Sequence, residues 1–382
     1  MKRIMIIAGE ASGDLHAGKL IYATTQKNYA VHFYGIGGDK MRAAGADIMV
    51  DSKEMAVVGL VEIWEHRKVI FGALNQMRDS ISHDPPDLLI LVDYPEFNLR
   101  LARHAKQHGV KVLFYISPQI WAWRQYRVKK IKRLVDMMAV VFPFETDFYR
   151  KHNVPVKFVG HPLVNEVNAS REKPALLEEF GLDANKPVIG LLPGSRRSEI
   201  KRLINIILES AKLTRSKIDD AQFIMPLAAT LDESELAPTL DQYSSLGIKV
   251  VKNRPYDVIA CCDVVLTVSG TVTLEIALLQ TPMIIINKVA WLTYAIVSRL
   301  LKIKYIGLCN IVANKCIAPE LIQHDATPKK ISTLLVKILS EKNLRKKMIK
   351  ELSEIESMLG SEGGIENIAK LTLEMLAEPK VS

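Results

Sequence analysis

The strongest structural signal in this chain is DLLILVDYPEFNLRLARHAKQHGVKVLFYIS (87–117). Its two apolar runs, DLLILVD (87–93) and KVLFYIS (111–117), are almost continuously hydrophobic, which is typical of parallel strands buried on both faces. Between them, Pro95–Gly109 has the length of a helix. The stretch therefore predicts a strand–helix–strand unit, the building block of a doubly wound parallel sheet.

The same alternation extends from this unit in both directions. Further strand candidates in the first half are RIMIIAG (3–9), VHFYGIG (31–37), MMAVVFP (137–143) and VKFVGHP (156–162). A second series comprises PVIGLLPGS (187–195), QFIMPLA (222–228), IKVVKN (248–253), DVVLTVSG (263–270) and PMIIIN (282–287). The polar segment Asn168–Pro187 separates the two series, and we interpret it as a linker region with room for one short helix.

The length of the chain supports a division into two domains. Its 382 residues exceed the size at which a single hydrophobic core usually stops growing. We therefore predict an α/β fold of two Rossmann-like domains with doubly wound parallel sheets, over 1–168 and 186–354. After Pro328 the chain is helical in pattern and highly charged, and we expect a tail from about 355 to 382 to pack on the first domain.

Composition and charge narrow the class of protein. A hydrophobic content of 48% with 24% charged residues excludes bulk disorder. The net charge of +9 favours an anionic partner, which leaves nucleic acid, anionic lipid and phosphorylated small molecules open. The lack of an arginine-rich tail or a known nucleic-acid motif argues against nucleic acid. The basic cluster RQYRVKKIKR (124–133) fits a solvated helix face and a phosphate or membrane-surface site equally well.

Cysteines and apolar segments indicate the compartment. The four cysteines form no C-x-x-C pair and have no histidine at zinc-ligand spacing, so we expect reduced thiols and no metal site. The N-terminus passes directly into the strand-like IMIIAG (4–9), without the pattern of a signal peptide. No uncharged apolar stretch reaches the ~18 residues of a membrane span. These features predict a cytoplasmic protein, soluble or at most peripheral to a membrane.

The loop after the run DVVLTV (263–268) has the composition of a phosphate site. In doubly wound sheets ligands bind beyond the carboxyl ends of the strands. Ser269, Gly270, Thr271 and Thr273 are small enough for backbone N–H groups to approach an anion at a helix N-terminus. Glu275, one helical turn beyond Thr271, is suited to accept both hydroxyl protons of a ribose. A capped helix with a first-turn acid is the structural alternative.

A second loop of this kind follows the first strand of the second domain. Gly194 permits a tight turn, Ser195 is small, and Arg196 supplies a guanidinium suited to phosphate oxygens. The alternative is a surface turn with solvated arginines, since Arg197 follows directly. Two phosphate-suited loops at strand ends of one domain strengthen the prediction of a diphosphate site.

The first domain has a different kind of loop after its first strand. The segment AGEASGD (8–14) lacks the G-x-G-x-x-G fingerprint, as does GIGG (35–38), so a dinucleotide cofactor is not expected. Its acids would repel a pyrophosphate. Gly9, Glu10, Ser12 and Gly13 are better suited to bind sugar hydroxyls.

Asp93 is the candidate general base. It ends the strand DLLILVD (87–93), and a carboxylate at that place can take a proton from an attacking hydroxyl. A helix N-cap before Pro95 is the structural alternative, which Asp also serves well. Glu10 and His16 are rival bases.

Two aromatic and apolar segments complete the pattern. Trp121 and Trp123 lie beside the basic cluster and fit either core packing or a site wall or membrane interface. Met55–Met77 is apolar with His66, Arg67 and Lys68 interleaved, a pattern typical of a core-facing helix and, less often, of a membrane surface.

These segments together resemble one family, the lipid-A-disaccharide synthases, glycosyltransferases of the two-Rossmann-domain type called GT-B. The resemblance runs nearly end to end, and its most specific part is the WAWR segment within the order of the whole set. It is carried by AGEASGDLHAG (8–18), GIGGDKM (35–41), VDYPEFN (92–98), ISPQIWAWRQYRVKKI (116–131), FPFE (142–145), VGHPL (159–163), LLPGSRRSEI (191–200), VSGTVTLEIALLQTPM (268–283) and Asn310 with PELIQ (319–323).

The resemblance implies a reaction and its substrates. The family joins UDP-2,3-diacylglucosamine to 2,3-diacylglucosamine 1-phosphate, an inverting transfer that releases UDP and forms a β-1,6 disaccharide in lipid A synthesis. By resemblance, Asp93 is the base for the acceptor 6-hydroxyl, and Arg196 and Asn310 correspond to positions important for activity. The Ser269–Thr273 loop would hold the diphosphate and Glu275 the ribose.

The resemblance also implies a membrane-facing element and no cofactor. Transferases of this fold generally need no bound metal, and the chain has no Asp-x-Asp pair. The first domain would receive the acceptor and its acyl chains at the cytoplasmic surface of the inner membrane of a Gram-negative bacterium, with the protein bound peripherally. The acyl or membrane contacts would come from Val58, Leu60, Trp64, Ile70 and Phe71.

Two departures from the family pattern and two other functions stay open at this point. Asn314 stands where Gly is usual, and Glu96 where Asp is common. Another enzyme that uses UDP-N-acetylglucosamine on the same scaffold, an epimerase or a transferase with a soluble acceptor, is the first alternative. A basic binding module without turnover is the second.

Overall fold

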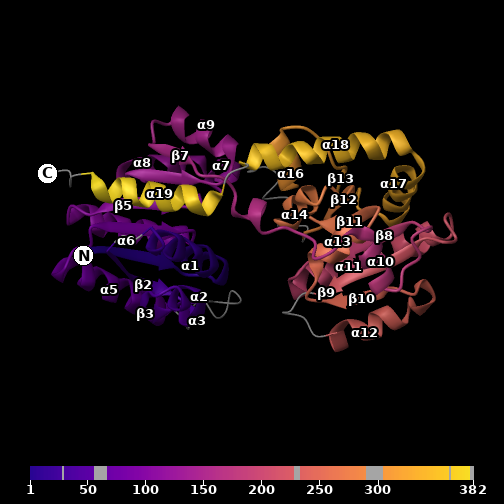
Figure 1. Cartoon of the computed structure of the whole chain (residues 1–382), viewed down its shortest axis with the longest axis horizontal. Helices are drawn as coiled ribbons and strands as arrows, with labels where there is room; N and C mark the ends of the chain where they lie inside the picture. Colours follow the sequence, from indigo (N-terminus) through magenta and orange to yellow (C-terminus); the bar gives the residue numbers. More distant parts are fainter. Residues whose placement is uncertain (28–29, 56–66, 228–232, 290–303, 361–362, 379–382) are drawn as a thin grey trace. The chain divides into compact units, whose positions relative to one another are not determined.

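The computed structural model describes residues 1–27, 30–55, 67–227, 233–289, 304–360 and 363–378. The chain forms two compact units (Figure 1): unit 1 comprises Met1–Pro162 with Leu359–Ser382, and unit 2 comprises Leu163–Met358. The polar segment 168–187 falls within unit 2. It contains helix α10 (Lys173–Glu179), which is joined to the unit by an ion pair between Glu179 and Arg254.

Unit 1 is built on a seven-stranded parallel sheet in the order β3-β2-β1-β4-β5-β6-β7. The strands are β1 (Lys2–Ala8), β2 (Val31–Gly37), β3 (Asp47–Asp51), β4 (Leu88–Val92), β5 (Lys111–Tyr115), β6 (Met137–Val140) and β7 (Val156–Phe158). Every residue of β4 and β5 is buried, which explains their continuously apolar sequences. The edge strand β3 was not expected, because its sequence DIMVD has acids at both ends and little apolar length.

Helices cover both faces of this sheet. They are α1 (Ala11–Thr25), α2 (Asp39–Ala43), α3 (Ser52–Met55), α5 (Arg67–His83), α6 (Pro95–Gln107), α7 (Ile120–Trp123), η1 (Gln125–Arg127), α8 (Val128–Leu134), α9 (Pro143–Lys151) and α19 (Gly364–Ala377), with η2 (Pro162–Asn165) at the boundary of the units. No described helix is both long and apolar enough to cross a membrane.

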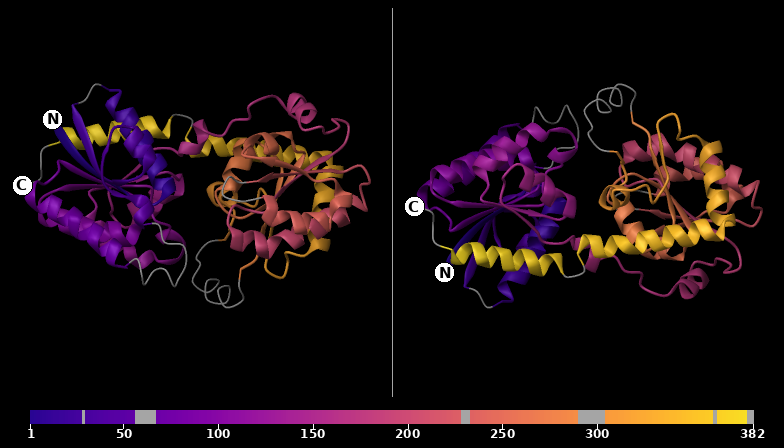
Figure 2. Two further views of the ribbon diagram at one scale, coloured as in Figure 1. Left: turned by 90° about the horizontal axis from the view of Figure 1, so that it is seen from below. Right: turned by 90° about the horizontal axis from the view of Figure 1, so that it is seen from above.

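The C-terminal helix α19 packs against α1 in unit 1, and Figure 2 shows it in yellow beside the indigo N-terminal elements. Lys111, a buried lysine at the start of β5, donates from Nζ to the backbone oxygens of Met375 (3.2 Å) and Glu378 (3.0 Å). These are carbonyls at the end of the helix, which have no partners within the helix and favour a cation. Lys111 therefore holds the last turn of α19 against the sheet.

Unit 2 repeats the architecture with a six-stranded parallel sheet in the order β10-β9-β8-β11-β12-β13. Its strands are β8 (Val188–Leu192), β9 (Gln222–Leu227), β10 (Lys249–Lys252), β11 (Val264–Val268), β12 (Met283–Asn287) and β13 (Glu320–Ile322). Its helices besides α10 are α11 (Arg197–Arg215), α12 (Glu233–Asp241), η3 (Ser244–Leu246), α13 (Pro255–Cys261), α14 (Val272–Leu278), α16 (Leu308–Ala313), α17 (Pro328–Ser340) and α18 (Lys342–Leu359). The three-residue strand β13 was too short to be recognised in the sequence.

Both sheets reverse their strand order at one point, between β1 and β4 in unit 1 and between β8 and β11 in unit 2. In doubly wound folds ligands bind outside the carboxyl ends of the strands at this reversal. The predicted site loops follow these four strands: Gly9–Gly13 follows β1, Asp93 follows β4, Gly194–Arg196 follows β8, and Ser269–Glu275 follows β11. The prediction of two doubly wound parallel sheets is confirmed.

Candidate functional site

In unit 2, the loop after β11 presents small polar residues at the reversal point. Gly270 has φ of 144°, a conformation that favours glycine, and Thr271 at the N-cap of α14 is exposed. The side-chain amide of Asn287, at the end of β12, donates to Ser269 Oγ at 2.7 Å. Because the Ser269 oxygen accepts this bond, its hydroxyl proton can be donated elsewhere, as an anion requires. Thr273 is buried and bonds within the unit.

The loop after β8 lies beside this one. Gly194 has φ of 103°, and a Cβ added to it would lie 3.3 Å from Cγ2 of Val268, the last residue of β11. Ser195 and Arg196 are exposed. The Arg196 side chain is 80% exposed, and its guanidinium is paired with Glu199 at 3.3 Å, a surface ion pair of little strength. The guanidinium can therefore turn to a phosphate at small cost.

Glu275 lies one turn into α14, and its electrostatic surroundings are acidic. Burial is the main cause that raises its pKa, and the neighbouring carboxylate of Glu166 raises it further. Burial and the charges of the same two carboxylates raise the pKa of Tyr256 to about 12. Burial of a carboxylate favours its pairing with hydroxyl donors, which a ribose offers.

Glu166 and Tyr256 were not predicted from the sequence. Tyr256 lies in the first turn of α13, shortly after β10, so its position just beyond the carboxyl end of a strand is a signal present in the sequence. Glu166 follows η2 in an irregular segment, and no sequence pattern indicates its place beside α14.

Asn310 lies inside unit 2 and has no exposed surface. Its Nδ2 group donates to the backbone oxygen of Ala318 at 2.7 Å and to Glu320 Oε1 at 2.8 Å. Its Oδ1 atom accepts from the backbone N–H groups of Ile317 at 2.8 Å and Ala318 at 3.0 Å. Both amide protons and both acceptor positions are therefore used within the protein. Asn310 is therefore an internal residue of unit 2, and its side-chain amide does not face solvent.

In unit 1, the reversal point brings Gly9 and Asp93 together. Gly9 is the first residue after β1, and a Cβ there would lie 2.7 Å from the ring of Tyr94, so glycine is needed for this packing. Asp93 and Tyr94 both have left-handed backbones, with φ of 48° and 42°. Such residues are strained and cluster at functional sites. The carbonyl of Asp93 accepts from the side chain of Asn98 at 2.5 Å, which holds this turn in place.

The Asp93 carboxyl is not the cap of helix α6. The N-cap position belongs to Tyr94, and the helix has no side-chain cap there. Burial raises the pKa of Asp93, the negative charge of Glu10 raises it further, and the Tyr94 N–H opposes the shift. A carboxylate made more basic in this way is suited to general-base chemistry at neutral pH.

Glu10 and Ser12 are exposed at the start of α1, while Gly13 is buried against Ala8 and Val92. Their side chains face solvent at the same strand end as Asp93. The four loop residues predicted to bind sugar hydroxyls therefore divide into two exposed polar groups and two buried glycines. Packing requires glycine only at Gly9, since a Cβ on Gly13 would meet Ala8 at an ordinary 3.5 Å. Asp14, the next residue, has a structural role.

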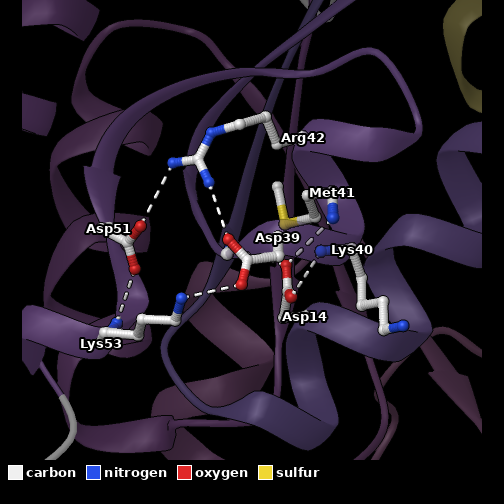
Figure 3. A network of polar contacts seen from close by, with 8 residues as sticks. Asp14, Asp39, Lys40, Met41, Arg42, Asp51 and Lys53 are labelled. Carbon is white, nitrogen blue, oxygen red and sulfur yellow. Dashed lines mark hydrogen bonds and ion pairs between the residues drawn. The ribbon is translucent and has the colours of Figure 1, made fainter.

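Asp14 caps helix α2 from within α1. Its carboxylate accepts from the backbone N–H groups of Gly38 (2.6 Å), Lys40 (3.0 Å) and Met41 (3.1 Å), as Figure 3 shows for the last two. These N–H groups begin the helix and have no partners within it. A carboxylate at a helix N-terminus also interacts favourably with the helix dipole. An exposed network of Asp39 with its basic neighbours lies beside this cap.

Replacing Asp14 by Ala should lower the free energy of unfolding by about 2–3 kcal/mol, because buried N–H groups lose a charged acceptor. Chemical denaturation followed by circular dichroism measures this. The matched control is Asp39→Ala on α2, whose exposed ion pairs contribute little, so its unfolding curve should overlay that of the unchanged protein. Equal curves for the two variants would contradict the capping role of Asp14.

The predicted acyl contacts are only partly described. Val58, Leu60 and Trp64 lie outside the described residues. Ile70 is half-buried and packs against the core of unit 1, whereas Phe71 is 43% exposed on α5, with the Arg100 guanidinium 5.7 Å from its ring centre.

The two neighbouring tryptophans have different environments. Trp121 is buried and donates from Nε1 to Glu145 Oε1 at 3.0 Å, while Trp123 is 43% exposed under the Arg124 guanidinium. Burial raises the pKa of Glu145 to about 8, against the opposing effect of its hydrogen bonds. Trp121 is thus a core residue, and only Trp123 fits a surface role.

Within the described parts of both units, His, Cys, Asp and Glu side chains form no group of three or more that could hold a metal ion.

Comparisons with known proteins give a consistent result. A family model described as "Lipid-A-disaccharide synthetase" matches residues 4–369. The chain is 51% identical over 379 residues to the lipid-A-disaccharide synthase of Geobacter metallireducens, across 99% of this chain and 98% of that relative.

Solved structures share the architecture at low sequence identity. The UDP-GlcNAc 2-epimerase of Neisseria meningitidis bound to UDP-GlcNAc has a TM-score of 0.64 at 14% identity, covering 98% of this chain and 99% of that one. The calicheamicin glycosyltransferase CalG4 has a TM-score of 0.63 at 13% identity, covering 99% and 100%. At these identities the likeness concerns the fold, and it confirms the predicted GT-B architecture.

Proposed function

The chain belongs to the lipid-A-disaccharide synthase family, glycosyltransferases of lipid A biosynthesis, and from this premise we propose how its residues carry the reaction. The donor is UDP-2,3-diacylglucosamine and the acceptor is 2,3-diacylglucosamine 1-phosphate. The products are the β-1,6-linked disaccharide 1-phosphate and UDP. Unit 1 receives the acceptor, and unit 2 holds the nucleotide of the donor.

The chemical step is an inverting displacement with Asp93 as the base. Its carboxylate takes the proton of the acceptor 6-hydroxyl while that oxygen forms a bond to the anomeric carbon of the donor. The bond from the anomeric carbon to the β-phosphate oxygen breaks, and UDP leaves with the electron pair. The raised pKa of Asp93 favours proton transfer, because a more basic carboxylate binds the proton of the acceptor hydroxyl more strongly in the transition state. Glu10 and Ser12 bind hydroxyls of the acceptor.

The leaving group is held by the two loops at the reversal point of unit 2. Ser269, Gly270 and Thr271 contact the diphosphate, and Arg196 neutralises the charge that develops on it. Glu275 accepts hydrogen bonds from the ribose hydroxyls. This arrangement requires no metal or other cofactor, since the Arg196 guanidinium and the hydrogen-bond donors of the loop stabilise the negative charge on UDP.

The observation that carries the proposal is the placement of Asp93, a half-buried carboxylate of raised pKa, at the reversal point of a sheet in a chain of this family. The direct test is release of UDP from the two acylated sugars, followed with the purified protein. Formation of the disaccharide is the expected result. UDP-sugar epimerised without acceptor, or binding without turnover, would contradict it and favour one of the two alternatives.

We also place the protein at the cytoplasmic surface of the inner membrane of a Gram-negative bacterium, bound peripherally. The support is chemical, since both substrates carry acyl chains. The exposed ring of Phe71, with Arg100 beside it, is the described part of the surface assigned to acyl or membrane contact. Sedimentation with vesicles of anionic phospholipid tests this placement.

Replacing Glu10 by Gln should move the acid limb of the kcat/KM profile to lower pH. The charge of Glu10 raises the pKa of Asp93, so its removal lowers that pKa. A general base acts only when unprotonated, and activity then persists to lower pH. The measurement is the midpoint of the acid limb in a plot of kcat/KM against pH, which can be determined even if the maximal kcat/KM of the variant is lower. Glu96→Gln is the control, since Glu96 does not perturb Asp93, and an unmoved midpoint in E10Q would refute the coupling.

A further inference from the structure

We propose that Glu320 is a positioning residue of the donor site, and that Asn310 acts through Glu320 and not by contact with substrate. The inference rests on the proposed function, because the loop that these residues position is the one assigned there to the diphosphate. It concerns unit 2 alone.

The first step is the saturation of the Asn310 amide. Its four hydrogen bonds with nitrogen and oxygen partners, to Ala318, Ile317 and Glu320, lie between 2.7 and 3.0 Å, and the side chain is fully buried. An amide in this state has no donor left for a phosphate or a sugar. Any effect of Asn310 on catalysis must therefore pass through the groups that it holds.

The second step is the carboxylate that Asn310 holds. Glu320 begins β13, and its Oε1 atom accepts from Asn310 Nδ2 and from the Gly307 N–H at 2.9 Å. Its Oε2 atom accepts from the Ile306 N–H at 2.9 Å. Glu320 thus fixes the backbone that leads into α16, and Asn310 fixes the rotamer of Glu320. The fit is tight, because a Cβ added to Gly307 would lie 2.4 Å from Ile285 Cδ1.

The third step connects this backbone to the donor loop. The N–H of Leu308, the residue after Gly307, donates to Thr273 Oγ1 at 3.0 Å. The Thr273 hydroxyl in turn donates to the carbonyl of Gly270 at 2.8 Å. A continuous chain of hydrogen bonds therefore runs from Asn310 through Glu320 and the 306–308 backbone to Gly270. Gly270 has φ of 144°, and because glycine has many backbone conformations open to it, these hydrogen bonds select one of them.

The physical consequence is a loop whose donors are set before the ligand arrives. If Glu320 is removed, the N–H groups of Ile306 and Gly307 lose a charged acceptor and the segment shifts. Thr273 then loses its partner, and the Gly270 turn becomes one of several conformations. Binding of a diphosphate must restore the order, which lowers affinity.

The test compares Asn310→Ala, Glu320→Ala and the double variant, using UDP alone as the probe in calorimetric titration. Each single variant should weaken UDP binding by about 10- to 100-fold, the usual loss when a buried charged hydrogen bond is broken. The double variant should bind UDP no more weakly than the weaker-binding single variant, because both changes break the same series of hydrogen bonds. Turnover should show a raised KM for the donor, with a smaller change in kcat.

A matched control separates positioning from loss of stability. Thr214 is buried near the end of α11, where its hydroxyl donates to the Ser210 carbonyl at 2.7 Å. Thr214→Ala should lower the melting temperature while UDP binding stays within about twofold, since its helix-internal bond is remote from the network.

The outcomes are distinct. If the losses of UDP affinity in Asn310→Ala and Glu320→Ala multiplied in the double variant, the two residues would act independently and the inference would be overturned. A lowered kcat with unchanged UDP affinity in Asn310→Ala would also overturn it, in favour of direct substrate contact. Unchanged UDP binding in Glu320→Ala would also overturn it. Failure of the unchanged protein to bind UDP would instead refute the proposed function.

Discussion

Replacing Asp93 by Asn should lower kcat by about 10²- to 10⁴-fold, the range that a positioned general base contributes. The amide keeps the shape of the side chain and the unusual backbone, but it cannot accept the proton of the acceptor hydroxyl. UDP binding, which the proposal assigns to unit 2, should not change. Disaccharide formation under saturating substrates measures the first effect, and titration with UDP measures the second.

The other end of the same strand supplies the control for Asp93. Asp87 directly precedes β4, and it accepts from Lys2 Nζ at 3.0 Å and from the Arg3 N–H at 2.9 Å. Asp87→Asn changes the same residue type on the same strand, away from the reversal point, and should leave kcat within about threefold. If Asp93→Asn retained full turnover, the base would have to be another group.

Replacing Arg196 by Ala should lower kcat/KM by about 10²-fold or more, since removing one preorganised group that stabilises transition-state charge costs about that much. Its side chain is 80% exposed and pairs only weakly with Glu199, so folding depends little on it. Arg196→Lys should recover part of the activity, because it restores the charge without the bidentate geometry.

Arg197 offers a control of the same chemical type. Its side chain is 73% exposed and is paired with Glu235 at 2.6 Å. Arg197 is the first residue of α11, and Arg196 is the residue directly before the helix. Arg197→Ala removes the same charge from the neighbouring position and should alter kcat/KM by less than about threefold. Equal losses in Arg196→Ala and Arg197→Ala would mean that general positive charge, and not one guanidinium, serves the diphosphate.

Much of the fold could be predicted because a buried segment has a recognisable pattern of apolar residues in its own sequence. The buried strands β4 and β5 appear in the sequence as continuous apolar runs, and the helix α6 begins at the proline that the sequence places there. The edge strands β3 and β13 left no such trace, because a short strand with polar ends resembles a loop.

The candidate site was predictable in part for the same reason. Ser269 and Arg196 follow recognisable strands of one parallel sheet, and such strands end at one edge, so the neighbourhood of these two residues could be inferred from strand order alone. For the same reason Asp93 could be placed at the corresponding edge of the other sheet. Tyr256 follows β10, whose run IKVVKN (248–253) was recognised as a strand, but the residues after it, RPYD (254–257), lack the small polar residues of a phosphate loop. Glu166 lies far from Glu275 along the chain, and no periodicity relates the two.

By itself, the sequence determined the two parallel sheets, the loops at their reversal points and the family to which the chain belongs. Only the tertiary structure decided what each side chain does there. Asn310 has all its amide hydrogen bonds inside unit 2, Trp121 is held by Glu145, and the pKa of Asp93 is raised by burial and then by Glu10. The physical reason is that burial and periodicity are properties of a segment. Hydrogen bonds and pKa shifts depend on pairs of groups that the chain brings together only on folding.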